Sequence, residues 1–220
     1  MKRTMGLVCL CVLAACGGDG TPTGSGDMAS DMLTNNSGSD MAMSSGAKRV
    51  FVTSQAYNGN LGGFTGADAK CNLLAQAANV TGTWKAWLSA STSSALDRIA
   101  GNGPWKSIAH LDEFSGLVQE TIFNNRAGLM VVPLTNIHYD ELGYDVTGNG
   151  QLSAPVWTGT VLGGTISTGG TCQNWTSSTC SFGSDCDYGE TGSANAIQQW
   201  TDYENPTQCG EMLRIYCFEQ

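Results

Sequence analysis

Nine cysteines are the residues of this sequence with the clearest chemistry, and they fall into two groups. The first group, Cys9, Cys11 and Cys16, lies at the N-terminus. An even set of cysteines in an exported domain is typical of paired disulfides, and six of them leave fifteen pairings open. This second set consists of Cys71, Cys172, Cys180, Cys186, Cys209 and Cys217.

Residues 1–15 have the order of a secretory signal peptide. Lys2 and Arg3 give a positive start, and a short apolar run and two alanines precede Cys16. The run is too short to span a bilayer. The four residues Leu-Ala-Ala-Cys at 13–16 resemble the lipobox of bacterial lipoproteins, which implies that Cys16 carries lipid and anchors the chain to a membrane. An ordinary signal peptide with an incidental Cys16 is the alternative.

Residues 16–47 are predicted to form a disordered tether after the lipidated cysteine. They are rich in Gly, Ser, Asp and Met and contain no lysine, arginine or aromatic residue. Such a composition cannot bury enough apolar surface to offset the entropy of ordering. A methionine-rich segment that binds Cu(I) is the more specific alternative, but the irregular spacing of the methionines favours a tether. Gly17 is compatible with sorting to the outer membrane of a bacterial envelope.

Residues 48–220 are long enough for one domain with a substantial core. Without the signal peptide the chain keeps eight basic and nineteen acidic side chains, a formal charge of −11. This charge argues against nucleic acid, heparin-like polyanions and anionic lipid as partners.

One amphipathic helix is the firmest predicted element. Thr65 and Asp68 have the helix-start pattern of a hydroxyl followed three residues later by an acid. Apolar residues then recur at helical spacing on one face, which places Cys71 on the buried side. These residues are Ala67, Cys71, Leu74, Ala75 and Ala78.

The remaining elements are short strands and long loops, which indicates an α+β domain. A short helix fits residues 94–100. The segment 163–195, rich in Gly, Ser, Thr and Asp, is predicted to be a long loop region. The expected strands are 49–53, 84–88, 156–160 and 213–218.

Four blocks, in order, resemble endostatin, the C-terminal domain of certain collagens. They are residues 62–88, which include Gly-Gly-Phe-Thr-Gly-Ala-Asp-Ala-Lys-Cys, and residues 156–160, 172–176 and 209–219. The same order is similar to a bacterial domain of unknown function in the C-type-lectin-like superfamily. The resemblance covers about residues 49–219. It implies a disulfide-stapled C-type-lectin-like (endostatin-like) fold with mixed, mainly antiparallel strands, one long helix and a long loop region.

The resemblance also implies which cysteines pair. The implied pairs are Cys71–Cys217 and Cys172–Cys209, which leave Cys180 and Cys186 to each other. Endostatin's own activities do not carry over. Its zinc ligands are mostly histidines near its start, whereas here His110 and His138 are the only two. Its heparin site is basic, whereas this domain is acidic.

The calcium-dependent branch of the superfamily binds sugars through oxygens of the long loop and the following strand. Trp200-Thr201-Asp202 resembles its Trp-Asn-Asp element, with Thr in place of the amide residue. Calcium requires six to eight oxygen ligands. An acidic solvated loop is the favoured alternative to a calcium site. The candidate ligands are Asp185, Asp187, Glu190 and Asp202.

Two further acidic patterns are interpreted as turns. Residues 145–150 loosely follow the start of an EF-hand loop, but Val156 occupies the position of its glutamate. Asp140, Glu141 and Asp145 could supply a glycosidase pair, although acids beside glycines are typical of a solvated turn. No nucleophile elbow or His-Glu-x-x-His motif is present.

Six tryptophans are candidates for sugar stacking, and for each of them core packing is favoured. At strand spacing Trp84 and Trp87 should point to opposite faces. Trp157 and Trp175 fall in the family blocks, so Trp105 and Trp200 are predicted to be the more exposed of the six.

We expect a surface-anchored lipoprotein whose extracytoplasmic module binds a protein or a glycan. No cofactor is expected apart from the calcium considered above, and no enzymatic activity. The alternatives are a carbohydrate-active hydrolase that uses the acidic cluster and a structural lipoprotein of the envelope.

Overall fold

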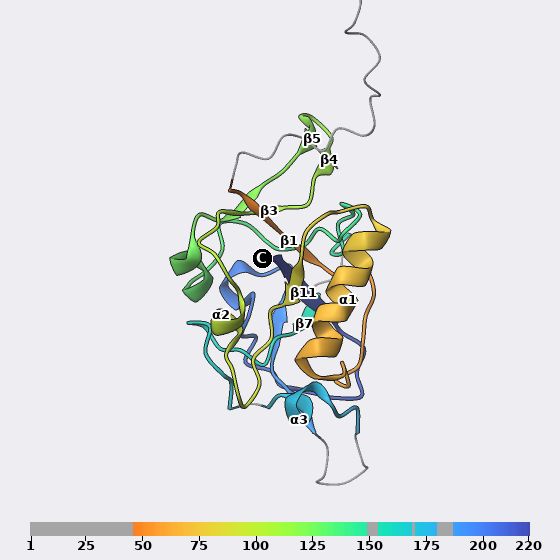
Figure 1. The fold of residues 1–220 in the computed structure, drawn as a ribbon, viewed down its shortest axis with the longest axis vertical. Coiled ribbons are helices and arrows are strands. Elements are labelled where there is room, and N and C mark those ends of the chain that lie inside the picture. The colour runs from red at the N-terminus through yellow and green to blue at the C-terminus, as the bar shows by residue number, and fades with distance from the viewer. Residues whose placement is uncertain (1–45, 149–153, 169, 180–186) are drawn as a thin grey trace, which may run out of the picture. The chain divides into compact units, whose positions relative to one another are not determined.

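A mixed sheet built around the last strand, β11 (Arg214–Glu219), runs through the domain (Figure 1). The computed structural model describes residues 46–148, 154–168, 170–179 and 187–220. Within those ranges no helix has the length and apolar character needed to cross a bilayer. The predicted signal peptide and residues 16–45 of the predicted tether, with Cys16, lie outside the described residues, as do Cys180, Asp185 and Cys186.

The strands of the sheet follow the order β6-β3-β1-β11-β7-β9, and β2 also pairs with β11. Two of the pairings, β1 with β3 and β11 with β7, are parallel, and the others are antiparallel. The domain is therefore α+β with a mainly antiparallel sheet. The strands are β1 (Lys48–Val52), β2 (Trp84–Ala86), β3 (Trp105–Ser107), β6 (Thr121–Phe123), β7 (Pro155–Trp157) and β9 (Thr191–Ser193).

The central position of β11 explains its apolar sequence. Ile215, Tyr216, Cys217 and Phe218 are all buried, as expected for a strand that is covered on both faces. On one side β11 pairs with β1, so the first and last strands are neighbours. On the other side β7 pairs with its first half and β2 with its second half.

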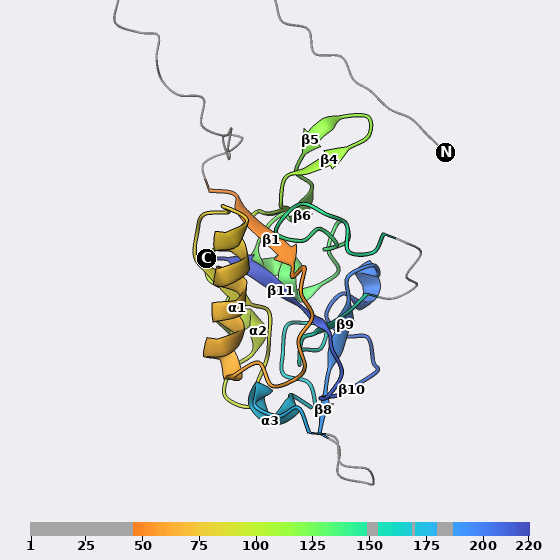
Figure 2. The same cartoon turned by 90° about the vertical axis from the view of Figure 1, so that its right-hand side faces the viewer.

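Helix α1 (Gly63–Ala77) covers one face of the sheet (Figure 2). Its buried residues are Ala67, Cys71, Leu74 and Ala75, as the helical spacing predicts. Cys71 is bonded to Cys217, so a disulfide joins the inner face of α1 to β11. The expected helix is confirmed, and it begins two residues earlier than Thr65.

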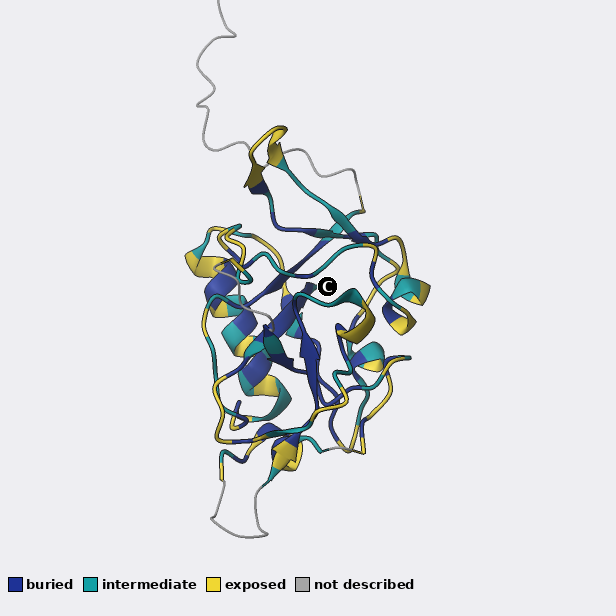
Figure 3. Ribbon diagram, turned by 180° about the vertical axis from the view of Figure 1, so that it is seen from behind, coloured by how far each residue is buried: buried dark blue, intermediate teal, exposed yellow. Residues whose placement is uncertain are grey.

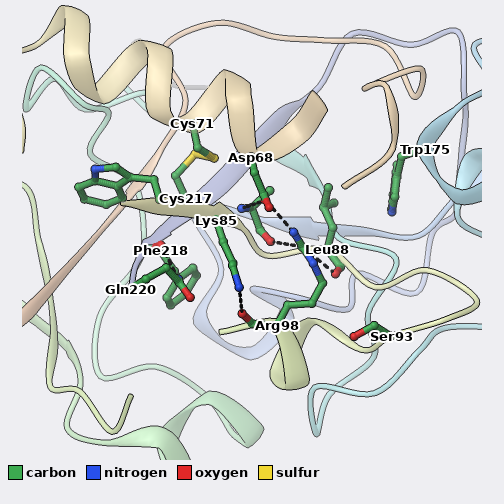
Figure 4. A network of polar contacts seen from close by, with 12 residues as sticks. Asp68, Cys71, Lys85, Leu88, Ser93, Arg98, Trp175, Cys217, Phe218 and Gln220 are labelled. Carbon is green, nitrogen blue, oxygen red and sulfur yellow. Dashed lines mark hydrogen bonds and ion pairs between the residues drawn. A yellow bond between two sulfur atoms is a disulfide. The ribbon is translucent and has the colours of Figure 1, made fainter. Parts of the chain in front are cut away.

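The predicted capping pattern at the start of α1 is wrong. Gly62 is the N-cap residue at φ 82°, and no side chain caps the helix. Asp68 instead accepts hydrogen bonds from the Ala86 backbone N–H at 2.9 Å and from Arg98 Nη2 at 2.6 Å (Figure 4). A carboxylate in the second turn of α1 thus fixes β2 and the short helix α2 (Ala95–Arg98) against α1.

The other face of the sheet is covered by an aromatic cluster. Trp87, Trp105, Phe123 and Trp200 pack around Phe218 with ring centroids 4.9–6.1 Å apart. Trp105 and Trp200 are 0% and 1% exposed, so the prediction that they are the exposed tryptophans is wrong. Trp84 packs in the core beneath α1, which confirms that Trp84 and Trp87 occupy opposite faces.

The remaining elements are short and lie outside the main sheet. The hairpin β4 (His110–Asp112) and β5 (Gly116–Val118) projects from the domain (Figure 2). The predicted loop region contains α3 (Cys172–Trp175) and β8 (Tyr188–Gly189) besides β9. The other elements are β10 (Thr207–Gln208) and the 3-10 helices η1 (Arg126–Met130) and η2 (Ile197–Gln199).

Candidate functional site

A polar pocket of about 520 Å³ lies beside α3. We call it the loop-region pocket. Its side chains are amides, hydroxyls and one carboxylate, all of which can exchange hydrogen bonds with a polar ligand. The lining residues are Asn60, Gln173, Thr176, Ser177, Ser178, Thr179 and Asp187.

The wall of the pocket is a left-handed turn. The residues of α3 all have positive φ: 49° at Cys172, 53° at Gln173, 58° at Asn174 and 66° at Trp175. For residues other than glycine this conformation costs roughly 1–2 kcal/mol each, because Cβ crowds the carbonyl oxygen. A run of such residues persists only where the surroundings hold it, and such strain is concentrated at functional sites.

Three contacts hold the left-handed turn in place. Cys172 is bonded to Cys209, which fixes the start of the turn. Trp175 is fully buried and donates from Nε1 to the Ser89 carbonyl at 2.8 Å. Asn174 accepts from the Ser91 backbone N–H at 2.8 Å. The turn is therefore fixed at both ends, and Gln173 remains exposed toward the pocket.

Two glycines make room for the Cys172–Cys209 disulfide. A Cβ on Gly59 would lie 2.4 Å from Cys172 Sγ, and one on Gly189 would lie 2.8 Å from the same sulfur. Both positions therefore exclude a side chain. The Gly59 backbone N–H donates to the Cys209 carbonyl at 2.7 Å. This close contact between the two backbones places the adjacent Asn60 at the pocket.

Asp187 is the charged group among the described residues that line the pocket. Its carboxylate accepts from Gln173 Nε2 at 3.0 and 2.9 Å and from the Ser177 hydroxyl. These hydrogen bonds, first from Ser177 and then from Gln173, lower the pKa of Asp187 below its ordinary value. Asp187 is therefore a fixed, ionised acceptor at neutral pH.

Glu190, three residues later, has a different environment. It is buried and accepts from the Ser167 hydroxyl at 2.9 Å and from the Thr191 backbone N–H at 3.2 Å. Desolvation raises the pKa of Glu190, and the charges of Asp202 and Glu204 raise it further. Glu190 thus accepts hydrogen bonds at the junction between β8 and β9 and is not among the residues that line the pocket.

Asp202 serves a turn rather than the loop-region pocket. Its carboxylate accepts from the Glu204 backbone N–H at 3.2 Å and from the Leu162 backbone N–H at 3.4 Å. The neighbouring Thr201 is buried and accepts from Trp87 Nε1 at 2.7 Å. In this chain Trp200-Thr201-Asp202 therefore joins the aromatic core to a turn.

The candidate calcium ligands that the structure describes have separate partners. Asp187 lines the pocket, Glu190 is buried, and Asp202 caps a turn. In the described ranges no three His, Cys, Asp or Glu side chains are grouped so that they could hold a metal ion. The described acids therefore do not form one calcium site.

The acids considered for hydrolysis also act as backbone acceptors. Asp140 accepts from the Leu142 and Tyr144 backbone N–H groups, each at 2.9 Å. Glu141 is buried and accepts from Ser54. Asp145 accepts from Thr147 and lies 3.1 Å from His138 Nδ1, with its pKa lowered by these contacts despite partial desolvation.

Sequence reasoning identified Asp187 but missed the other residues of the pocket. Gln173 and Thr176 fall in a block that was interpreted only through the family resemblance, and Asn60 is distant in sequence. The available signal was the run Gln-Asn-Trp-Thr-Ser-Ser-Thr between Cys172 and Cys180, in which six of seven residues are amides or hydroxyls.

Comparison with known proteins gives a family for the chain. No curated protein matches it. A family described as "Protein of unknown function (DUF1554)" matches residues 54–197, a range that includes α1, the left-handed turn and Asp187. Because the match covers more than half of the chain, the protein belongs to the DUF1554 family.

Proposed function

We propose that this protein is a lipid-anchored envelope lipoprotein whose domain, of C-type-lectin-like fold, binds glycans through the loop-region pocket. The anchor rests on the lipobox resemblance at Cys16. The fold assignment is supported by the bonds Cys71–Cys217 and Cys172–Cys209, which are the pairs implied by the resemblance to endostatin.

The chemistry of the pocket lining is the observation that supports sugars as the class of ligand. Sugars present dense arrays of hydroxyl groups that both donate and accept, and amides and hydroxyls match both roles. An ionised carboxylate adds a stronger, charge-assisted acceptor. Asp187 has about four lone-pair sites and uses three for Gln173 and Ser177, so acceptor capacity remains for a sugar hydroxyl.

The charge of the domain narrows the class of glycan. Among its described lining residues the pocket has Asp187 and no basic side chain, and the chain as a whole is acidic. A sialylated or sulfated glycan would therefore be repelled. We propose neutral or amino sugars as the ligands, with the left-handed turn providing a preformed wall.

The test is binding of the full chain and its variants to a glycan array of neutral, amino and sialylated sugars. Asp187→Asn should weaken binding to the sugars recognised by the wild type by about tenfold, because a charge-assisted hydrogen bond is lost. Glu211→Gln, which removes an exposed carboxylate outside the pocket, is the matched control and should leave binding unchanged.

Two results would count against the proposal. One is an array on which the wild type recognises no neutral or amino sugar. The other is sugar binding that is equal in the Asp187→Asn and Glu211→Gln variants. A parallel measurement with a calcium chelator present should give the same affinities, because the proposed binding through the loop-region pocket uses no calcium.

A further inference from the structure

The β4–β5 hairpin presents large apolar side chains to solvent. Phe114, in its turn, is 94% exposed and Leu111 is 82% exposed. Leu117 lies directly opposite Leu111 across the two strands and is also exposed. Figure 3 shows the exposed colour gathered at this projecting end of the domain. Contiguous exposed apolar surface of this kind marks an interaction site.

The hairpin is held in shape without a partner. Asp112 Oδ1 accepts from the backbone N–H groups of Phe114 at 3.0 Å and Ser115 at 2.7 Å, which fixes the turn. At its root, His110 is buried and stacks on Tyr139 with centroids 3.5 Å apart. A preformed tip loses little conformational entropy when it binds.

Two further exposed apolar side chains lie on the turn that packs against the root of the hairpin. A Cβ on Gly143 would lie 2.6 Å from the Ala109 carbonyl oxygen, so this turn packs closely against the start of β4. On either side of Gly143, Leu142 and Tyr144 are exposed.

The electrostatics around the hairpin are negative. Between Lys106 and Arg126 the sequence has Asp112, Glu113 and Glu120 and no basic residue apart from His110. Burial raises the pKa of Tyr139, and the nearby charges of Glu120, Asp145 and Asp112 raise it further. The charges of Glu120, Asp145 and Asp112 thus act on Tyr139 at the root of the hairpin, and Glu113 lies in its turn.

We propose that the hairpin tip, formed by Leu111, Phe114 and Leu117, docks into a protein partner that offers an apolar socket rimmed by Lys or Arg. Charge complementarity selects this occupant. A second copy of this acidic chain, or its own tether with four aspartates and no basic residue, would bring like charges together. A bilayer would have to accept Asp112 and Glu113 beside Phe114, which is unfavourable.

The test uses defined probes with the purified full chain. The first probe is a synthetic amphipathic helix of Leu and Lys, and the second is the same peptide with Glu in place of Lys. Vesicles of phosphatidylcholine are the third probe. We expect the chain to bind the Leu/Lys peptide, with affinity falling as salt is added, and to bind neither the Leu/Glu peptide nor the vesicles.

Matched variants separate docking from general attraction to an acidic protein. Phe114→Ser keeps every charge and should weaken binding of the Leu/Lys peptide at least tenfold. Leu73→Ser removes a comparable exposed leucine from α1, 64% exposed, and should change affinity less than twofold. Glu113→Gln should weaken binding two- to fivefold.

Equal loss in Phe114→Ser and Leu73→Ser would overturn the proposal, as would equal binding of the Leu/Lys and Leu/Glu peptides. Vesicle binding that depends on Phe114 would also overturn it and would assign the hairpin to a membrane. Unchanged thermal unfolding of both serine variants would show that the comparison is made on folded protein.

Discussion

At the scale of single residues, two acids three positions apart have opposite chemistry. Hydrogen bonds from Ser177 and Gln173 lower the pKa of Asp187, whereas burial raises the pKa of Glu190. Asp187 faces the pocket and Glu190 faces the interior, because neighbouring positions around β8 point to different sides. Sequence reasoning grouped these acids as possible ligands of one ion, since composition does not reveal which side chain is buried.

The pKa of Glu190 predicts how stability changes with pH. A carboxyl whose pKa is raised on folding binds more protons in the folded state, so its contribution to stability falls as pH rises from its unfolded pKa, near 4.5, through its folded pKa. Glu190→Gln removes this penalty and keeps an acceptor for Ser167. The variant should gain free energy of unfolding relative to wild type as pH rises from 4 to 7, measured by urea denaturation.

Asp187→Asn is the control, because the pH dependence of stability that Asp187 contributes has the opposite sign. Its lowered pKa stabilises the folded state above its unfolded value near 3.8, and that contribution is lost as pH falls through the folded pKa. The free energy of unfolding that Asp187→Asn loses relative to wild type should therefore disappear in strong acid. A pH-independent difference between Glu190→Gln and wild type would contradict the assignment.

At the scale of elements, α1 and β11 could be predicted from the sequence, whereas α3 could not. The helical spacing of Ala67, Cys71 and Leu74 predicts one buried face of a helix, and this spacing can be read from a short stretch of sequence. The left-handed turn contains no glycine, and only Asn174 is of a residue type that favours this conformation, so the local signal is weak. Its cause is tertiary: the bond to Cys209 and the burial of Trp175 impose the conformation.

Gln173 tests whether the strain of this turn serves the pocket. Gln173→Gly relieves the positive φ of 53° and should raise the free energy of unfolding by up to about 1 kcal/mol. The same change removes two hydrogen bonds to Asp187 and should weaken sugar binding severalfold. Gain of stability with loss of binding, from denaturation and array data together, is the expected result.

Gln173→Val is the matched control for this substitution. It also removes the contact with Asp187, but a β-branched residue fits this backbone poorly and should lower stability by more than 1 kcal/mol. If glycine destabilised the protein as much as valine, the turn would not be strained at Gln173.

At the scale of the whole molecule, the error about Trp105 and Trp200 has a physical origin. Each is buried only because distant segments assemble on the second face of the sheet around Phe218. Long-range packing of this kind leaves no periodic signal in a short stretch of sequence. The disulfide pairs are different, because the family resemblance already implied both of those formed by the described cysteines.

The two disulfides should therefore have separable roles. Cys71–Cys217 closes 146 residues and joins α1 to the central strand, and its loss should cost about 5 kcal/mol of stability by the chain-entropy account. Cys172–Cys209 closes 37 residues, so its loss should cost about 4 kcal/mol. Only the second bond holds the left-handed turn, and only its removal should abolish sugar binding by molecules that remain folded.

Double alanine variants of each pair make this comparison, because each removes two buried sulfurs and leaves a similar void. Denaturation gives the stability, and array binding under folding conditions gives the function. Retention of binding in Cys71→Ala/Cys217→Ala with loss in Cys172→Ala/Cys209→Ala is expected. The Cys71–Cys217 bond joins α1 to β11 and is not part of the pocket lining. Loss of binding in Cys71→Ala/Cys217→Ala with retention in Cys172→Ala/Cys209→Ala would therefore mean that the pocket depends on the packing of α1 against the sheet and not on the strained turn.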